Sequence, residues 1–289
     1  MPELPEVETV RRGLESLIIG KIVKAEVHDT EKGFPNAPSN VNAFLIGASI
    51  VAVRRRAKVL LIDLSSDYSL VIHLKMTGQL VFVGKTRFGA GHPNDSLINS
   101  LPDKSTRVEL TFDDNSKLFF NDQRKFGWVK LMPTLEIPNI DFMKKVGPEP
   151  LEDDFTKEQF KDRFTRRART NIKAAILDQT VVAGVGNIYA DESLWGAKIH
   201  PKRLVASIAN NEFDQLYTEL REVMNLAIEK GGSSNHTYIN AEGKRGSYMD
   251  FARVFRREGL TCPRHPDVII EKLRVAGRGT HICPVCQVE

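Results

Sequence analysis

The chain has 289 residues, of which 41% are hydrophobic and 27% are charged, and its formal net charge is +4. This length predicts two or three domains, and the composition is that of an ordinary soluble globular protein. The apolar runs are short and interrupted, so we expect no transmembrane helix, and from the early acidic residues we expect no signal peptide.

The cysteines and the charges indicate a compartment and a partner. All three cysteines lie near the end of the chain and make no disulfide framework, so we expect a reduced, cytosolic protein. The segment 244–289 holds nine Lys/Arg and five Asp/Glu, and it therefore carries a charge of +4, equal to that of the whole chain. A basic segment on a near-neutral body suggests a polyanion bound through its phosphates, the alternative being a solvated basic face.

The first six residues, MPELPE, have the composition of a reactive terminus. Proline at position 2 allows removal of Met1, which leaves a secondary amine at Pro2 beside the carboxylate of Glu3. A terminal amine has a pKa of about 7.7–8.0, against about 10.4 for lysine, so an appreciable fraction is unprotonated at neutral pH. Such an amine can attack a carbonyl-like carbon while Glu3 moves protons. A frayed tail is the alternative interpretation.

A helix is predicted directly after this terminus. Pro5 suits the first position of a helix, and Glu6 in the first turn favours the helix dipole. Apolar residues then recur at spacings of three and four: Val7, Val10, Leu14 and Leu17. A packed helix would pin the terminus, which argues against a frayed tail.

The segment 21–133 predicts strands, in a β-sandwich or flattened barrel capped by the first helix. Residues 70–76 alternate with a period of two, and residues 113–116 predict a hairpin turn between two further strands. Residues 84–105 are rich in Gly, Pro, Asn and Ser, and they predict a long surface loop.

Helical spacing begins after four prolines between residues 133 and 150, which mark a linker. The apolar face of residues 213–228 predicts a helix that ends at Gly231-Gly232, and residues 231–248 predict a mobile loop. Gly184 and Gly186 precede a helix at Asn187, where backbone amides could bind phosphate; a tight turn between helices is the alternative.

The C-terminal segment has the spacing of a structural zinc site. Cys262 and His265 form one close pair, and Cys283 and Cys286 form a second after a hairpin-sized interval. Four protein ligands leave no open position for catalysis, so the metal would stabilise the fold. His281 is a competitor for the place of His265, although the paired spacing favours His265.

Arg278 lies between the two ligand pairs, in a Gly-Arg-Gly sequence. An arginine at the tip of a zinc-stabilised hairpin suits contacts to phosphate or to a DNA groove. A surface arginine with no role is the alternative.

Three motifs together resemble the formamidopyrimidine-DNA glycosylase family. Residues 2–9 resemble the N-terminus of that family, residues 179–192 its helix–two-turn–helix element, and the Cys/His module its zinc finger. The matches run in the family's order from residue 2 to residue 287, so the resemblance covers essentially the full chain.

The resemblance implies an α+β multidomain fold. We expect an N-terminal catalytic β-sandwich with a capping helix at 1–133 and a linker at 134–150. A helix–two-turn–helix domain with a base-capping loop would follow at 151–243, and a β-hairpin zinc finger at 244–289 would hold one structural Zn²⁺. Within the loop, the stretch 232–246 would fold over the extruded base.

The resemblance also implies a role for each matching residue. In such enzymes the amine of Pro2 attacks C1′ of the damaged nucleotide, Glu3 assists opening of the sugar ring, and Lys58 contacts phosphate. The catalytic set is Pro2, Glu3, Glu6 and Lys58. Three residues would contact phosphates: His73, Asn187 and Arg278. Three more would fill the space left by the extruded nucleotide: Met76, Arg124 and Phe126.

This last set agrees with the physical requirement for nucleotide extrusion. A duplex hides the glycosidic carbon, so the nucleotide must be flipped out at a cost of a few kcal/mol. Apolar wedges hold the unstacked DNA, and an arginine can read the edge of the orphaned base. Judged by sequence pattern alone, Met76 and Phe126 would more often be core residues.

The implied function is that of a bifunctional glycosylase and abasic-site lyase. The substrate would be duplex DNA with oxidised purines, such as 8-oxoguanine and formamidopyrimidines, cleaved through a proline iminium and β,δ-elimination. We expect a monomer without membrane contacts, cytoplasmic and associated with the bacterial nucleoid.

The sequence differs from the family pattern at two places, and two alternative functions remain. The family finger usually has four cysteines, whereas His265 replaces the second here, and residues 85–104 form an extended loop without an assigned role. One rival is an endonuclease VIII-like glycosylase for oxidised pyrimidines, against which Leu4 and the set Met76, Arg124 and Phe126 argue. The other is a DNA-binding protein without catalysis, which would need no free terminal amine.

Overall fold

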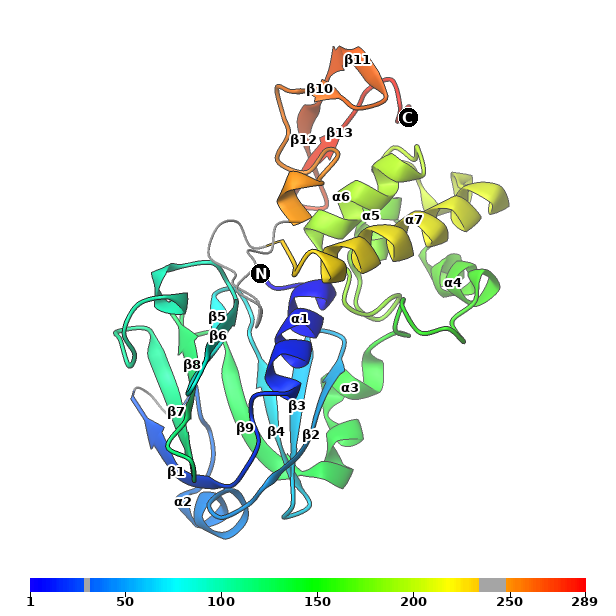
Figure 1. Cartoon of the computed structure of the whole chain (residues 1–289). Helices are drawn as coiled ribbons and strands as arrows, with labels where there is room; N and C mark the ends of the chain where they lie inside the picture. Colours follow the sequence, from blue (N-terminus) through cyan, green and yellow to red (C-terminus); the bar gives the residue numbers. More distant parts are fainter. Residues whose placement is uncertain (29–31, 234–247) are drawn as a thin grey trace. The chain divides into compact units, whose positions relative to one another are not determined.

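The computed structural model describes residues 1–28, 32–233 and 248–289 (Figure 1). The chain divides into two compact units. The first comprises Met1–Lys144 with Lys230–Ser247, and the second comprises Lys145–Glu229 with Tyr248–Glu289.

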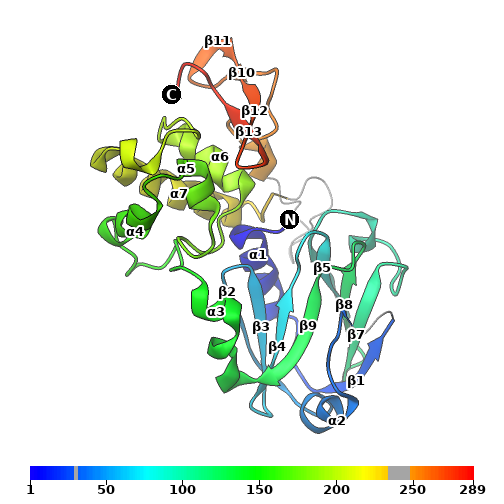
Figure 2. The same cartoon turned by 180° about the vertical axis from the view of Figure 1, so that it is seen from behind.

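The first unit contains two antiparallel sheets, seen from behind in Figure 2. One sheet has the strand order β1-β7-β8-β5-β6 and the other has the order β2-β3-β4-β9. The bounds are β1 Ile22–Val27, β2 Ile50–Arg56, β3 Val59–Leu64, β4 Tyr68–His73, β5 Gly78–Val83, β6 Arg87–Gly91, β7 Thr106–Phe112, β8 Lys117–Asp122 and β9 Trp128–Pro133. Short helical segments in this unit are α2 Pro38–Asn40, η1 Val41–Leu45 and η2 Asp95–Leu97. The predicted β-sandwich is confirmed.

Helix α1 (Leu4–Glu15) packs against β2 and β6, which are edge strands of the two sheets. The predicted apolar face is buried at Val7, Val10 and Leu14, and these residues share one core cluster with side chains of both sheets. The helix ends at Glu15, so Leu17 of the predicted stripe lies beyond it and is half-buried. Burial along this face fixes the start of the chain, because the apolar contacts would be lost if the helix detached.

The interpretation of residues 84–105 as one long surface loop is only partly right. The segment contains β6, which pairs with β5 and has a buried face, and the short helix η2. Its bends are held by Arg87, whose guanidinium donates hydrogen bonds to the carbonyl oxygens of Leu97 and Asn99. A loop was predicted because the segment is rich in glycine. In the structure these glycines lie where other backbone atoms or side chains approach closely, a role that sequence composition does not distinguish from that of a loop glycine.

The alternation predicted for residues 70–76 is also only partly right. Strand β4 ends at His73, and both of its faces are buried, since Ile72 joins the sandwich core while Val71 packs with Ile137 in a second cluster. Beyond the strand, Met76 lies in the turn that leads into β5. The second cluster forms because η3 (Thr134–Asn139) and α3 (Asp141–Lys145) cover the outer face of the four-stranded sheet, within the segment predicted as a linker.

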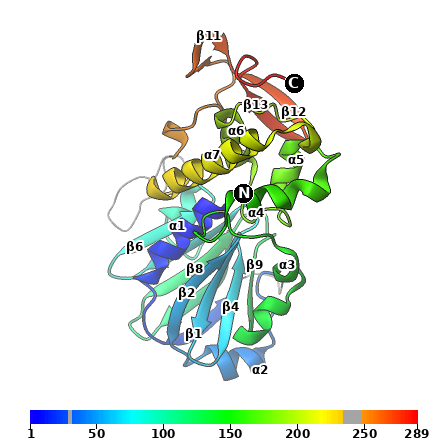
Figure 3. The same cartoon turned by 90° about the vertical axis from the view of Figure 1, so that its right-hand side faces the viewer.

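The second unit contains helices and two β-hairpins. Helices α6 (Asn187–Gly196) and α7 (Asn210–Glu229) lie side by side in Figure 3 and are in contact. The other bounds are α4 Lys157–Phe164, η4 Thr165–Arg167, α5 Ile172–Leu177, η5 Val205–Ser207, η6 Tyr248–Asp250, β10 Thr261–Cys262, β11 His265–Ile269, β12 Glu271–Val275 and β13 Arg278–Ile282. Strand β10 pairs with β11, and β12 pairs with β13. Within the described residues no helix is long and apolar enough to cross a membrane.

Gly13 provides a test of how α1 is seated. A Cβ atom built there would overlap the ring of Phe88 on β6, and that ring is buried. Alanine usually stabilises a helix interior by roughly 0.5–1 kcal/mol relative to glycine. Here we expect Gly13→Ala to lower the free energy of unfolding by about 1–3 kcal/mol, because the core is overpacked. Urea unfolding measures the change.

Phe88→Leu in the Gly13→Ala background serves as the matched control, because the smaller side chain vacates the space of the new methyl group. It should recover part of the lost stability. A Gly13→Ala variant more stable than the wild type would contradict the seating of α1 against β6.

Candidate active site and zinc centre

The N-terminus of α1 is held by the carboxylate of Glu6. Its Oε2 accepts a hydrogen bond from the backbone N–H of Glu3 at 2.8 Å, and its Oε1 accepts one from the N–H of Ser233 at 2.9 Å. Pro2 is buried, and Glu3 and Glu6 are 4% and 5% exposed. The structure therefore brings these three predicted residues together and gives the terminus a fixed backbone.

Lys58 follows the end of β2, in the turn to β3, and its side chain is buried. Ala57, the residue before it, has a left-handed backbone with φ of 53°. This turn is connected to α1 through Arg55. The Arg55 Nε donates to Glu8 at 3.1 Å, and its Nη1 donates to the carbonyl oxygen of Ala57 at 3.0 Å.

Glu8 is the carboxylate that receives this arginine. Burial raises the pKa of Glu8. Hydrogen bonds from Arg11 and Arg12 and the charges of Arg11 and Arg55 lower it by more, so the pKa of Glu8 lies below its ordinary value. Glu8 is therefore ionised at neutral pH and joins the helix that carries Pro2 to the hairpin that carries Lys58.

His73 ends β4 and is a neutral imidazole. Burial, together with the charges of Lys75 and Lys58, lowers the pKa of His73 to about 3. Its Nδ1 accepts a hydrogen bond from the N–H of Lys75 at 3.0 Å. The proton of the neutral ring is therefore on Nε2, which can donate to a phosphate oxygen without carrying a charge.

The predicted wedge residues lie in two turns of the first unit. Phe126 is 52% exposed and Arg124 is exposed, with the guanidinium 4.8 Å from the centre of the Phe126 ring. Met76 is half-buried. None of the three is a fully buried core residue, which is the arrangement that the resemblance implies.

Asn187 and Arg278 lie in the second unit, and the side chain of Asn187 contacts the backbone of the residue that follows Arg278. Asn187 is the first residue of α6, and its Nδ2 donates to the carbonyl oxygen of Gly279 at 2.9 Å. Arg278 is exposed and opens β13, directly after a turn in which Ala276 and Gly277 have positive φ. The stretch 232–246, predicted to cover the base, lies outside the described residues except for Gly232 and Ser233.

A buried ion pair supports this part of the second unit, and sequence reasoning missed it. The ammonium of Lys173 on α5 pairs with Asp191 on α6, and both side chains are inaccessible to solvent. Lys173 also donates to the hydroxyl of Thr280 at 2.6 Å, and Asp191 accepts from the N–H of His281 at 3.0 Å. Strand β13 is thus held beside α6. A lysine within an apolar helical pattern was the signal that could have revealed the pair.

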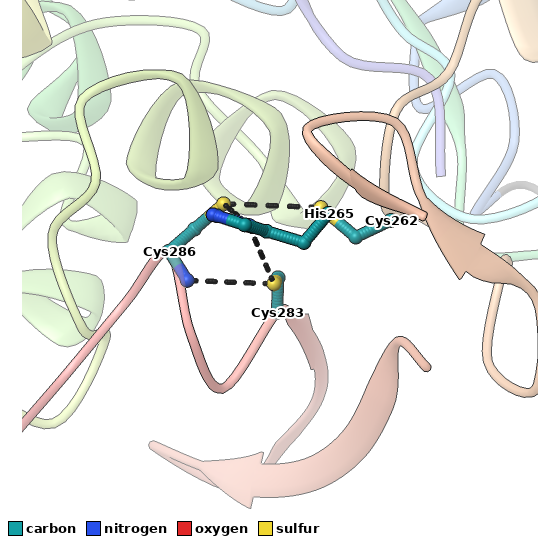
Figure 4. A group of neighbouring side chains, drawn as sticks. All are labelled: Cys262, His265, Cys283 and Cys286. Atoms are coloured by element: carbon teal, nitrogen blue, oxygen red, sulfur yellow. Dashed lines mark hydrogen bonds between the residues drawn. The ribbon is translucent and has the colours of Figure 1, made fainter. Parts of the chain in front are cut away.

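The four predicted zinc ligands converge, as Figure 4 shows. Cys262 and His265 come from the β10–β11 hairpin, and Cys283 and Cys286 lie in the segment that follows β13. All four ligand atoms lie within 4.8 Å of one another, and the Sγ atoms of Cys262 and Cys286 are 3.8 Å apart. That separation is about the edge of a tetrahedron with Zn–S bonds of about 2.3 Å. The residues therefore fit one structural Zn²⁺.

The competing histidine has another role. The Nδ1 of His281 is 3.0 Å from Asp191, and its Nε2 is 3.1 Å from Glu258. His265 instead directs its Nδ1 towards the sulfur of Cys286 at 3.2 Å. The structure therefore gathers His265, and not His281, with the three cysteines.

The surroundings of the thiols suit a cation. Burial and the neighbouring thiols of Cys283 and Cys262 raise the pKa of Cys286 to about 12, because thiolates crowded together repel one another. A divalent cation removes this repulsion. The side chain of Trp195 packs in the same apolar cluster as the three cysteines.

Known proteins resemble this chain over its whole length. Residues 1–129 match the formamidopyrimidine-DNA glycosylase N-terminal domain, residues 146–238 its H2TH domain, and residues 268–288 a zinc finger found in FPG and IleRS. The formamidopyrimidine-DNA glycosylase of Pediococcus pentosaceus is 42% identical, covering 100% of this chain and 99% of that protein. The chain belongs to the formamidopyrimidine-DNA glycosylase family.

Other relatives give the same result. The formamidopyrimidine-DNA glycosylase of Carboxydothermus hydrogenoformans is 40% identical, over 99% of this chain and all of that protein. A variant of the Lactococcus lactis enzyme, solved with DNA containing Fapy-dG, has a TM-score of 0.87 and 35% identity with full coverage of both chains. As a member of this family, the protein is a DNA glycosylase with abasic-site lyase activity that acts on oxidised purines in DNA.

The zinc site yields a prediction with a matched pair of histidine variants. We expect native mass spectrometry to find one zinc ion in the wild-type chain and in His281→Gln, and none in His265→Ala. Loss of one of four ligands weakens zinc binding. His281 contacts the carboxylates of Asp191 and Glu258 instead of the zinc site, so its replacement should leave the zinc bound. Zinc retained in His265→Ala and lost in His281→Gln would reverse the assignment.

The environment of His73 gives a pH dependence. Its folded pKa of about 3 lies below its ordinary value of 6.5, so it contributes stability that is complete above pH 6.5 and is lost as the pH falls towards 3. We expect the NMR signals of the His73 ring to show no titration between about pH 5 and 8, where an unperturbed imidazole titrates. A midpoint near 6.5 would contradict burial of the ring.

Proposed function

We propose that this chain excises 8-oxoguanine and formamidopyrimidines from duplex DNA by using the amine of Pro2 as nucleophile. The observation that carries the proposal is the fixed terminus: Glu6 accepts the N–H of Glu3, and the residues around Pro2 are buried on a packed helix. A nucleophile gains most from such positioning, because the entropic cost of alignment is met in folding.

The reaction begins at the glycosidic bond. The lone pair of the Pro2 nitrogen forms a bond to C1′, and the electrons of the C1′–N bond leave with the base, which takes up a proton. Opening of the sugar ring then gives an iminium, and Glu3, the carboxylate next to the amine, transfers the protons that this step requires. Met1 must be absent, since an acylated Pro2 nitrogen has no available lone pair.

The iminium then acts as an electron sink for strand cleavage. It acidifies C2′, and removal of that proton expels the 3′ phosphate, after which a second elimination expels the 5′ phosphate. The product is a one-nucleotide gap. Lys58, held at its turn by the Arg55 contact, would bind phosphate at the lesion, and Glu6 would keep the terminus in place.

The DNA contacts are proposed for residues of both units. His73, Asn187 and Arg278 would contact phosphates; Met76, Arg124 and Phe126 would occupy the space of the extruded nucleotide. The exposure of Phe126 and Arg124, and the position of Arg278 directly after a hairpin turn, support these roles. The zinc-bearing segment from residue 244 has a net charge of +4, equal to that of the whole chain, which suits a phosphate backbone.

We further propose the division of labour given by the segments 1–133, 134–150, 151–243 and 244–289. The first would carry catalysis, the second would link, the third would bind DNA and cover the base, and the fourth would hold zinc. We propose that the protein acts as a monomer in the bacterial cytoplasm, associated with the nucleoid through DNA.

Oxidised pyrimidines are the second candidate substrate class. One solved complex of the Lactococcus lactis enzyme contains DNA with an oxidised pyrimidine, and that enzyme has 34% identity and a TM-score of 0.85 with this chain. We propose oxidised purines as the main class and pyrimidines as the lesser one.

Borohydride trapping tests the amine mechanism. We expect a covalent adduct between the protein, with Met1 loss confirmed by mass, and a duplex with 8-oxoguanine opposite cytosine. Borohydride reduces the iminium to a stable amine, so the adduct should disappear in Pro2→Gly and in protein that retains Met1. Wild-type protein that binds purine and pyrimidine lesion duplexes without forming any adduct would leave only a DNA-binding role.

A further inference from the structure

Two turns of the first unit meet at one buried carboxylate. The first is the turn between β4 and β5, which contains Met76 and Thr77, and the second is the segment 123–127 between β8 and β9. Asp122, the last residue of β8, is inaccessible to solvent and lies between them. Neither Thr77 nor Asp122 was recognised from the sequence.

Asp122 binds the second turn through the backbone. Its Oδ2 accepts hydrogen bonds from the N–H groups of Phe126 at 2.9 Å and of Gly127 at 2.6 Å. Its Oδ1 accepts the N–H of Arg124 at 3.1 Å. Three of the five amides in this turn are therefore aimed at one carboxylate, which fixes the backbone that carries Arg124 and Phe126.

Thr77 joins the first turn to the same carboxylate. Its hydroxyl donates a short hydrogen bond to Oδ1 of Asp122, and its Oγ1 accepts the N–H of Arg124 at 3.0 Å. Thr77 is 7% exposed. Because Thr77 follows Met76 directly, these two hydrogen bonds set the distance between the turn of Met76 and the turn of Arg124.

The backbone leaves little freedom for another arrangement. A Cβ atom at Gly127 would lie 2.7 Å from the ring of Phe120 and 2.9 Å from the carbonyl oxygen of His73. Lys125 has a positive φ of 58°. The second turn is thus pressed against the end of β4 and bent sharply under the exposed side chains.

Nucleotide extrusion needs this kind of support. A wedge must enter the stack against an unfavourable unstacking energy of a few kcal/mol. A loop that becomes ordered only on binding DNA would add its own entropy loss to that cost, whereas a preformed loop has already met it in folding.

We propose that Thr77 and Asp122 are positioning residues for nucleotide extrusion, holding the Met76 turn and the Arg124–Phe126 turn in one register. This inference rests on the proposed function, because it takes Met76, Arg124 and Phe126 to occupy the space of the extruded nucleotide. It concerns residues that touch no DNA and act through the wedge alone.

Loss of Thr77 or Asp122 should affect the two substrates, 8-oxoguanine and an abasic site, to different degrees. A paired 8-oxoguanine must be unstacked and extruded before its glycosidic bond can be attacked. An abasic site has no base to unstack and costs less to extrude. Loss of wedge support should therefore slow excision of 8-oxoguanine strongly and cleavage at an abasic site weakly.

The test compares two threonine-to-valine variants in single-turnover assays on both duplexes. Thr77→Val removes the hydroxyl at nearly constant volume. Thr106→Val is the matched control, because Thr106 is 1% exposed, lies in β7 and donates to the buried amide oxygen of Asn121 at 2.9 Å instead of to Asp122 or to an amide of either turn. Thermal unfolding of each variant monitors the cost in stability.

We expect Thr77→Val to slow 8-oxoguanine excision about 10-fold and abasic-site cleavage less than about 2-fold, since a small displacement of a positioning group costs this much or more. Thr106→Val should leave both rates unchanged. Asp122→Asn should show the same selectivity, and the double variant should be less than additive, because both residues act through one contact.

Three results would overturn the inference. Thr77→Val with both rates at the wild-type value would show that the hydroxyl positions nothing. Equal slowing on the two duplexes, or the same slowing in Thr106→Val, would show a general loss of structure. Wild-type protein that cleaves abasic sites and excises oxidised pyrimidines but not 8-oxoguanine would remove the proposed purine function, and the inference would fall with it.

Discussion

The proposed reaction depends on holding the N-terminus of the chain in a fixed position. Termini are ordinarily the least ordered part of a protein, because few contacts oppose their conformational entropy. Here the terminus begins a helix whose apolar face is buried against β2 and β6, edge strands of two different sheets. The helix shields both edges, and the sandwich in turn holds the helix, so the stability of the core and the position of Pro2 are consequences of the same packing.

Buried carboxylates fix the backbone of the segments that we propose to face the substrate. Glu6 binds the backbone of Glu3, Glu8 binds Arg55 beside the Lys58 turn, and Asp122 binds three amides under Arg124 and Phe126. In the second unit, Asp191 holds β13 next to α6. A buried anion that lost its donors would be costly, and each carboxylate therefore fixes its segment.

This arrangement also separates the charges. Four carboxylates that hold these segments, Glu6, Glu8, Asp122 and Asp191, are buried and accept hydrogen bonds within their own unit, while Arg124 and Arg278 are exposed. A protein of modest net charge can thus present positive potential to DNA without an excess of cations over its whole surface.

Much of this could be predicted from the sequence, for identifiable reasons. Helix α1, the hairpin turn at 113–116 and helix α7 follow from local signals of spacing, and these predictions are confirmed. The spacing also predicts the four zinc ligands, and the structure brings these side chains together. Strand β6 was missed because its Gly89 and Gly91 serve close packing, which has no local signal.

Thr77, Asp122 and the pair Lys173–Asp191 were missed for a related reason. Their partners are 18 or more residues away along the chain, so only the folded chain shows what they bind. An aspartate at the end of a strand followed by an arginine and a glycine was the one available hint for Asp122. It indicates a side chain that caps the following turn, but not which second turn it also holds.

Peptide mapping of the borohydride-trapped protein–DNA adduct tests the central claim most directly, because it identifies the atom that attacks the sugar. After digestion with nuclease and protease, tandem mass spectrometry should place the deoxyribose remnant on the peptide that begins at Pro2, on the proline itself. A remnant on Lys58 or another lysine would contradict the account, since the nucleophile would then be a side chain and the fixed terminus would have a different purpose.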